Sequence, residues 1–201
     1  MGMLKKRIEQ LIPSGLQLKE CNQKSSLIAN FGDIQTKDFS GYCLAVTGKW
    51  LSNPKFVEDH ILDVRFQRDT MDMQREYEKA KEHGADFLGR KFPNLAHLVK
   101  KEVQPLTAEN LYNEIIYLGG QQLASGYIMI ALGDSTDYGH ALGVIINNGN
   151  YCFFDVNECF CSMGNVQAFW NFIYYYVTQE EYGLLKQGYN CFQVALYNHQ
   201  P

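Results

Sequence analysis

The first half of the chain has apolar residues at helical spacing. The segment CLAVTGKWLS, which starts at Cys43, predicts a buried helix. The charged segment Met71–His83 predicts a largely solvated helix, and Gly84 is placed to end it. Thr107 is suited to cap a further helix that runs to about Leu118.

Three other stretches complete this first half. Residues 3–12 also have helical spacing, and residues 13–42 are rich in Gly, Ser, Asn and Asp, which predicts loops with one short strand. Residues 54–103 carry half of the charged residues of the chain. We interpret them as a possible helical insertion within a single domain over residues 1–201.

The apolar pattern of the second half is typical of strands. Asn147-Asn-Gly-Asn150 predicts a hairpin turn, because Asn and Gly tolerate positive φ. Strands are predicted over residues 127–132, 140–146, 151–155 and 191–197. Helices followed by an antiparallel sheet indicate an α+β fold.

One segment of the second half allows two interpretations. Val166–Val177 is apolar almost all round, and Asn165 is suited to cap it as a buried helix. Its many aromatic residues suit a strand equally well. In either case we expect its aromatic side chains in the core.

Composition narrows the functional classes. The 201 residues are 46% hydrophobic and 20% charged, which allows a sizeable core. A net charge of -4 gives no reason to expect a nucleic-acid partner. No run approaches the roughly 20 apolar residues of a membrane span, and residues 1–12 lack the apolar stretch of a signal peptide. We therefore expect a soluble protein that is made in a cytosol, and any export would use no cleaved signal.

The chain has six cysteines, which allow three disulfides or free thiols. We favour free thiols, because the chain is long enough to fold without disulfides and shows no secretory signal. Cys159-Phe-Cys161 is too tightly spaced for a zinc knuckle, so we expect no metal or other cofactor.

Three residues form a candidate catalytic triad. Cys43 begins a predicted helix, whose positive end and unpaired N–H groups stabilise a thiolate nucleophile. The hairpin sets a register in which His140 faces position 157, two residues from Asp155 on the same face. Asp155 can then accept the Nδ1–H of His140 and orient it as the base. The ordinary alternatives are a buried structural thiol, a loop histidine and an aspartate that ends a strand.

The residues around this triad resemble the motifs of a known family. Gly41-Tyr-Cys43 followed by Trp50-Leu51, and the blocks Gly139-His140-Ala and Phe153-Phe-Asp155-Val-Asn157, resemble the YopT/AvrPphB-type cysteine peptidases. The resemblance covers roughly residues 35–160. It implies a papain-like fold, no cofactor, and a bacterial virulence effector that is delivered into a host cell and cleaves a host protein there.

The sequence departs from the family pattern near the oxyanion site and after the aspartate. Val156 replaces the proline of the family, and Asp38 lies where an oxyanion donor is expected, so Gln35 is only a weak oxyanion candidate. Two alternatives follow: a transglutaminase or deamidase that uses the same triad, and an inactive module that binds a host protein.

Overall fold

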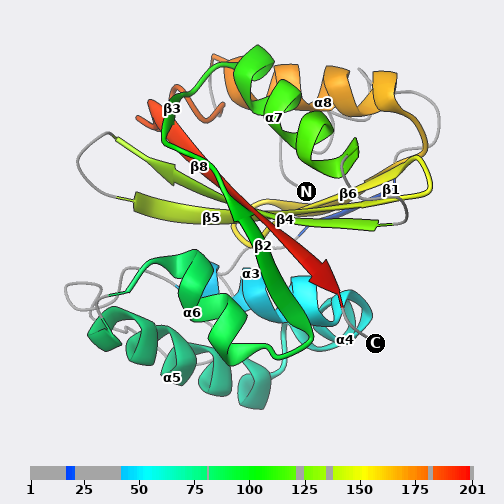
Figure 1. Cartoon of the computed structure of the whole chain (residues 1–201). Coiled ribbons are helices and arrows are strands. Elements are labelled where there is room, and N and C mark those ends of the chain that lie inside the picture. The colour runs from blue at the N-terminus through cyan, green and yellow to red at the C-terminus, as the bar shows by residue number, and fades with distance from the viewer. Residues whose placement is uncertain are drawn as a thin grey trace.

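The fold has three layers, with one antiparallel sheet between two groups of helices (Figure 1). This computed structural model describes residues 17–20, 42–80, 82–120, 125–134, 138–180 and 183–199. The helix predicted over residues 3–12 and the oxyanion candidate Gln35 lie outside the described residues. The short strand expected within residues 13–42 is present as β1 (Gln17–Glu20).

The strands follow the order β1-β7-β6-β5-β4-β8-β2, and β3 pairs with β8 beside this path. Every neighbouring pair is antiparallel. The strands after β1 are β2 (Leu95–Lys100), β3 (Gln104–Pro105), β4 (Ser125–Gly133), β5 (Tyr138–Asn147), β6 (Asn150–Asp155), β7 (Cys159–Met163) and β8 (Cys191–His199). Strands β4, β5, β6 and β8 lie where the sequence predicted them. Strands β2, β3 and β7 were not predicted. Strand β3 is very short, and β2 has no strict alternation of buried and exposed residues.

The hairpin between β5 and β6 has the predicted register. Asn147 pairs with Asn150, and Gly143 pairs with Phe154. Asn148 and Gly149 of the turn have φ of 49° and 78°. This left-handed backbone is favourable for Asn and Gly, which explains why this turn fixes the register.

The helices form two groups on opposite faces of the sheet (Figure 1). The lower group contains α3 (Cys43–Ser52), α4 (Pro54–His60), α5 (Val64–Ala80) and α6 (Gly84–Lys91), and the upper group contains α7 (Ala108–Gly120) and α8 (Val166–Thr178). The predicted caps of α7 and α8 are confirmed: Thr107 accepts the N–H of Asn110 at 3.0 Å, and Asn165 accepts the N–H of Ala168 at 2.8 Å. The segment with two interpretations is therefore a helix.

The prediction for Gly84 is wrong. Helix α5 already ends at Ala80, and Gly84 is the first residue of α6. A Cβ at this position would lie 3.0 Å from the Leu44 side chain of α3. Glycine therefore lets α6 lie close to α3 without displacing the Leu44 side chain, and it does not stop a helix here.

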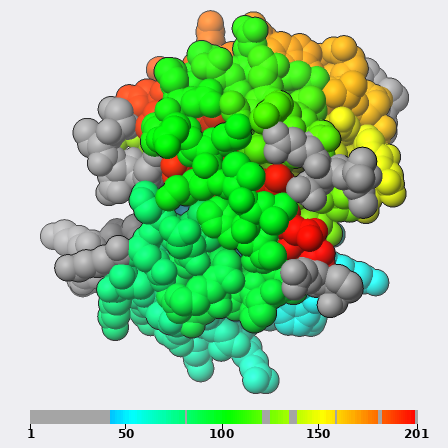
Figure 2. All heavy atoms as spheres, viewed as in Figure 1, coloured from blue at the N-terminus to red at the C-terminus, as the bar shows by residue number. Residues whose placement is uncertain are grey.

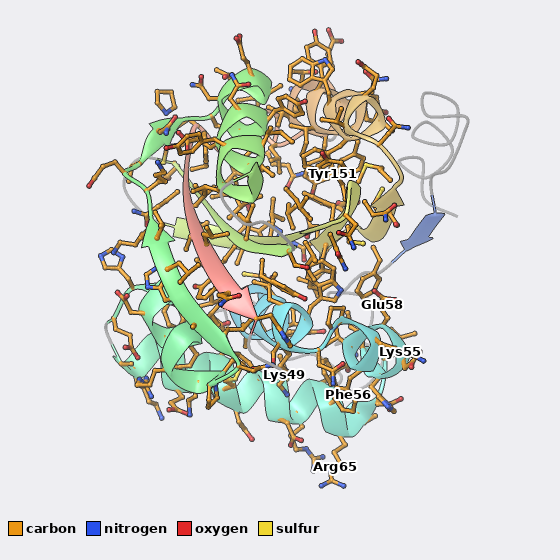
Figure 3. All side chains as sticks on the ribbon, turned by 45° about the vertical axis from the view of Figure 1, so that its right-hand side comes forward. Lys49, Lys55, Phe56, Glu58, Arg65 and Tyr151 are labelled. Carbon is orange, nitrogen blue, oxygen red and sulfur yellow. The ribbon has the colours of Figure 1, made fainter. Side chains whose placement is uncertain are left out.

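Each face of the sheet has its own core, because successive residues of a strand point to opposite faces. On β4, Ile128 and Ile130 pack in the upper core, and Met129 packs in the lower core. Figure 3 shows Tyr151 in the upper layer, where its ring stacks on that of Phe169 with centroids 4.8 Å apart.

Residues 54–103 supply α4, α5, α6 and β2. On the face drawn in Figure 2, the green part of the chain that includes α6, β2 and α7 fills the middle, and only small red areas of β8 are visible. That residues 54–103 are an insertion in a single domain stays a prediction. Among the helices of the described residues, none has both the length and the apolar character that a membrane crossing requires.

Candidate active site

Cys43 lies at the start of α3, and α3 is fixed to the sheet. Cys43 is buried, with 7% of the residue's surface exposed. The first backbone hydrogen bond of the helix runs from the Val46 N–H to the Tyr42 carbonyl at 3.0 Å. The N–H groups between them therefore have no partner within the helix, and together they form its positive end. Thr47 Oγ1 donates to the Ala141 carbonyl of β5 at 3.2 Å, which joins this helix to the strand that carries His140.

His140 and Asp155 form a buried ion pair. His140 Nε2 lies 2.8 Å from Asp155 Oδ1, and the two side chains are 3% and 2% exposed. The predicted proximity of these two residues across the hairpin agrees with this distance. The predicted ring atom is wrong, because Nε2 and not Nδ1 contacts the carboxylate. Nδ1 is therefore left to face the other side of the site.

Two further groups hold the Asp155 carboxylate. The Asn157 backbone N–H donates to Oδ1 at 2.8 Å, and the Tyr176 hydroxyl donates to Oδ2. Tyr176 was not predicted as a site residue, because its aromatic neighbours indicated only core packing. The signal it offered is general: a buried tyrosine hydroxyl usually has a hydrogen-bond partner.

The three candidate residues influence one another electrostatically. Burial lowers the pKa of His140, but the charge and hydrogen bond of Asp155, and then those of Cys43, raise this pKa well above its ordinary value. Burial raises the pKa of Asp155, but His140, the Tyr176 hydroxyl and the Asn157 N–H together hold it below its ordinary value. The arrangement therefore favours an imidazolium paired with a carboxylate.

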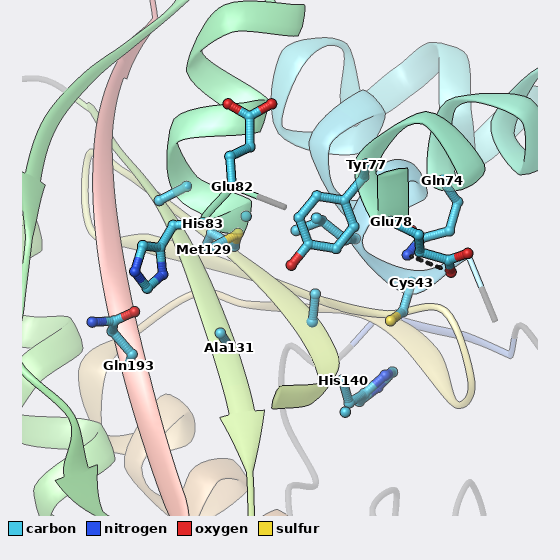
Figure 4. Close-up of a pocket in the computed structure, with 15 residues that line it drawn as sticks. Cys43, Gln74, Tyr77, Glu78, Glu82, His83, Met129, Ala131, His140 and Gln193 are labelled. Atoms are coloured by element: carbon cyan, nitrogen blue, oxygen red, sulfur yellow. Dashed lines mark hydrogen bonds between the residues drawn. The ribbon is translucent and has the colours of Figure 1, made fainter. Parts of the chain in front are cut away.

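A pocket of about 570 Å³ brings Cys43 and His140 together, although they lie far apart in the sequence. Figure 4 shows the Cys43 sulfur on the side of that residue that faces the His140 ring. Helix α5 contributes Gln74 and Glu78 to the wall next to Cys43, and Gln193 of β8 lies across the pocket. The site is thus open to a ligand at the sulfur, while the carboxylate behind the histidine is closed off.

Other cysteines of the described residues do not line this pocket. Cys152, Cys161 and Cys191 are free thiols, like Cys43. Burial raises the pKa of Cys152 and of Cys161. Cys161 is 2% exposed, because β7 pairs with β6 and places it in the upper core. Within the described ranges, no three His, Cys, Asp or Glu residues are grouped so as to hold a metal ion.

The sheet and its two helical layers form the α+β papain-like cysteine protease fold that the sequence predicted. The crystal structure of the Pseudomonas avirulence protein AvrPphB matches this chain with a TM-score of 0.55 and 10% sequence identity, over 80% of this chain and 93% of that chain. The resemblance to the YopT/AvrPphB-type cysteine peptidases is therefore confirmed at the level of the fold.

PatoxP, a cysteine protease-like domain of the Photorhabdus asymbiotica toxin PaTox, matches with a TM-score of 0.49 and 9% identity, over 96% of this chain and 57% of that chain. No protein-family model matches the sequence, and no curated protein matches it either.

Proposed function

We propose that this protein is a cysteine peptidase in which Cys43 is the nucleophile, His140 the general acid and base, and Asp155 the residue that orients His140. The observation that carries the proposal is a buried histidine–aspartate pair next to a cysteine at a helix start, in one open pocket. The papain-like fold supports the same assignment.

The buried ion pair favours a catalytic role over a structural one. Removing two charges from water costs several kcal/mol for each ion, and apolar residues of similar volume would often stabilise a core at least as well. A pair with 3% and 2% exposure is therefore not expected to stabilise the fold better than apolar residues would. It is useful, however, for holding an imidazole in one orientation.

Acylation is the first half of the proposed reaction. The Cys43 thiolate attacks the carbonyl carbon of a peptide bond, a C–S bond forms, and the carbonyl π electrons move to the oxygen. The oxyanion then collapses and the C–N bond breaks. His140 gives its proton to the leaving amine, which leaves an acyl-enzyme thioester and a neutral imidazole.

Deacylation returns the enzyme to its starting state. Neutral His140 accepts a proton from a water molecule, whose oxygen attacks the thioester carbon. The C–S bond breaks, so that the carboxylic acid product leaves and the thiolate forms again beside the imidazolium. Asp155 keeps its charge throughout, because it accepts the His140 hydrogen bond without taking the proton.

For the biological role, we propose a bacterial effector that is secreted into a host cell without a cleaved signal and cleaves a host protein there. The motif resemblance and the shared fold with an avirulence protein support this role. A deamidase or transglutaminase would use the same residues on a glutamine side chain, so the reaction products must separate these activities.

The test compares wild type, Cys43→Ala and Cys152→Ala after incubation with host-cell lysate, with mass spectrometry of new protein N-termini. Cys152→Ala is the matched control, because Cys152 is also a free thiol but does not line the pocket. We expect the same new N-termini from wild type and Cys152→Ala, and none from Cys43→Ala. Glutamine side chains that gain about one mass unit or an amine, without new N-termini, would replace peptidase activity by deamidation or transamidation.

A further inference from the structure

The first turn of α3 is completed by a side chain from another helix. Tyr42 occupies the N-cap position, but its side chain makes no capping hydrogen bond, so the free N–H groups of the turn need other partners. Gln74 of α5 supplies one of them, because its Oε1 accepts the Ala45 N–H at 3.1 Å. Gln74 is 4% exposed. The carbonyl end of this amide is therefore held against α3, two residues from Cys43.

The nitrogen end of the same amide has donor capacity on the pocket side. Gln74 lines the pocket together with Cys43, and its Nε2 donates to Glu78 Oε1 at 3.5 Å (Figure 4). That distance is long for an N–H···O hydrogen bond. A primary amide carries two N–H donors, so one long contact does not use them both.

We propose that Gln74 is the side-chain donor of the oxyanion hole and acts with the backbone N–H of Cys43. This inference rests on the proposed function, in which Cys43 attacks a carbonyl carbon. The attack places a negative oxygen next to the sulfur. Because a helix rises by about 1.5 Å per residue, the Ala45 N–H that holds Gln74 lies only about 3 Å along the axis from the Cys43 N–H. The amide is thus anchored where the new charge develops.

Gln193, the other amide that lines the pocket, does not suit this role. Its Nε2 already donates to the Lys101 carbonyl at 2.8 Å, and it lies across the pocket from Cys43 (Figure 4). Gln193→Glu therefore serves as a matched control, since it makes the same chemical change in the same pocket but away from the sulfur.

The informative variant is Gln74→Glu. A glutamate keeps an oxygen that can accept the Ala45 N–H, so the start of α3 retains its partner, but it has no N–H to donate to an oxyanion. Gln74→Met is the second variant; it is neutral and lacks both the donor and the acceptor. Circular dichroism checks that each variant is folded.

Two reagents separate oxyanion stabilisation from thiolate reactivity without a known substrate. p-Nitrophenyl acetate acylates Cys43: the C–S bond forms, an oxyanion develops, and the C–O bond then breaks to release p-nitrophenolate. Iodoacetamide alkylates the same sulfur by displacing iodide, and no oxyanion forms. The ratio of the two rate constants at Cys43, followed by mass spectrometry, cancels changes in thiolate reactivity and in the fraction of folded protein.

We expect Gln74→Glu and Gln74→Met to lower this ratio by about 10²-fold, as the loss of one oxyanion donor does elsewhere, and Gln193→Glu to leave it within twofold of wild type. Unchanged ratios in both Gln74 variants, or equal slowing with both reagents, would overturn the role of Gln74 as a donor. A wild-type Cys43 that reacts no faster than Cys152 with either reagent would instead overturn the proposed function itself.

Discussion

At the scale of single residues, Asp155 is the most constrained group of the site. Its carboxylate is 2% exposed, and it accepts hydrogen bonds from His140, from the Asn157 N–H and from the Tyr176 hydroxyl. A buried carboxylate is stable only when such donors replace water. The same donors fix the orientation of the carboxylate, so that its Oδ1 faces the imidazole. The orientation of His140 therefore depends on groups from β6, the following turn and α8.

The ion pair predicts how stability depends on pH. The pKa of His140 is raised in the folded protein, so its contribution is complete below about 6.5 and is lost as the pH rises through the raised value. The pKa of Asp155 is lowered, so its contribution is complete above about 4 and is lost as the pH falls through the lowered value. We expect the free energy of unfolding of wild type to fall above about pH 6.5, and His140→Gln to show a smaller fall.

Urea unfolding at a series of pH values from 5 to 9 measures this dependence. His60→Gln is the control, because His60 and Asp63 form an ion pair at 2.7 Å with side chains that are 44% and 57% exposed. Exposed ion pairs contribute little to stability, so this variant should keep the wild-type slope. Equal slopes for wild type and His140→Gln would contradict the prediction.

At the scale of elements, the contact between α3 and β5 sets the distance from Cys43 to His140, the proposed nucleophile and base. Trp50 of α3 packs over Gly143 of β5, and its ring stacks on Phe154 with centroids 5.2 Å apart. A Cβ at Gly143 would lie 2.8 Å from the Trp50 ring. Glycine at this position thus allows α3 to lie close to the strand that carries His140.

Gly143→Ala is expected to destabilise the protein by about 1–3 kcal/mol, because the added methyl group must displace a buried indole. Since the same shift moves α3 relative to β5, acylation of Cys43 by p-nitrophenyl acetate should also slow. Urea unfolding and the acylation rate constant measure the two effects. Gly164→Ala is the control, because a Cβ there would meet only the Asn150 side chain at 4.0 Å. If Gly143→Ala keeps the wild-type stability and acylation rate, the contact between Trp50 and Gly143 does not control the position of α3 relative to β5.

At the scale of the whole molecule, the candidate site combines residues from both helical layers and from the sheet between them. Cys43 belongs to the lower layer, and the Tyr176 hydroxyl that holds Asp155 belongs to the upper layer. His140 connects them, because it contacts Asp155 and lines the pocket with Cys43. The alignment of the three residues is therefore a property of the assembled fold, and no single segment contains it.

This arrangement explains which parts of the site were predictable. The pairing of His140 with Asp155 follows from one short turn, which fixes the register locally. The contact of His140 with Cys43 depends on the docking of α3 over about a hundred residues of chain, so the sequence could suggest it only through the residue types, their order and the motif resemblance. Gln74 was missed because it lies on a helix whose charged residues indicate solvation, while the pocket uses its buried side.

Two matched substitutions test whether only one helical layer controls the reactivity of Cys43, the proposed nucleophile. Leu51 of α3 and Leu111 of α7 are both fully buried, in the lower and upper cores respectively. Leu51→Ala and Leu111→Ala should each destabilise the protein by about 2–5 kcal/mol, because each leaves a cavity. Only Leu51→Ala loosens the helix that carries Cys43. We expect it to slow acylation of Cys43 about tenfold in the folded protein, since small displacements of a reacting group cost much of the rate. Leu111→Ala should leave this rate within twofold of wild type, and equal slowing in both variants would mean that the two layers respond as one unit.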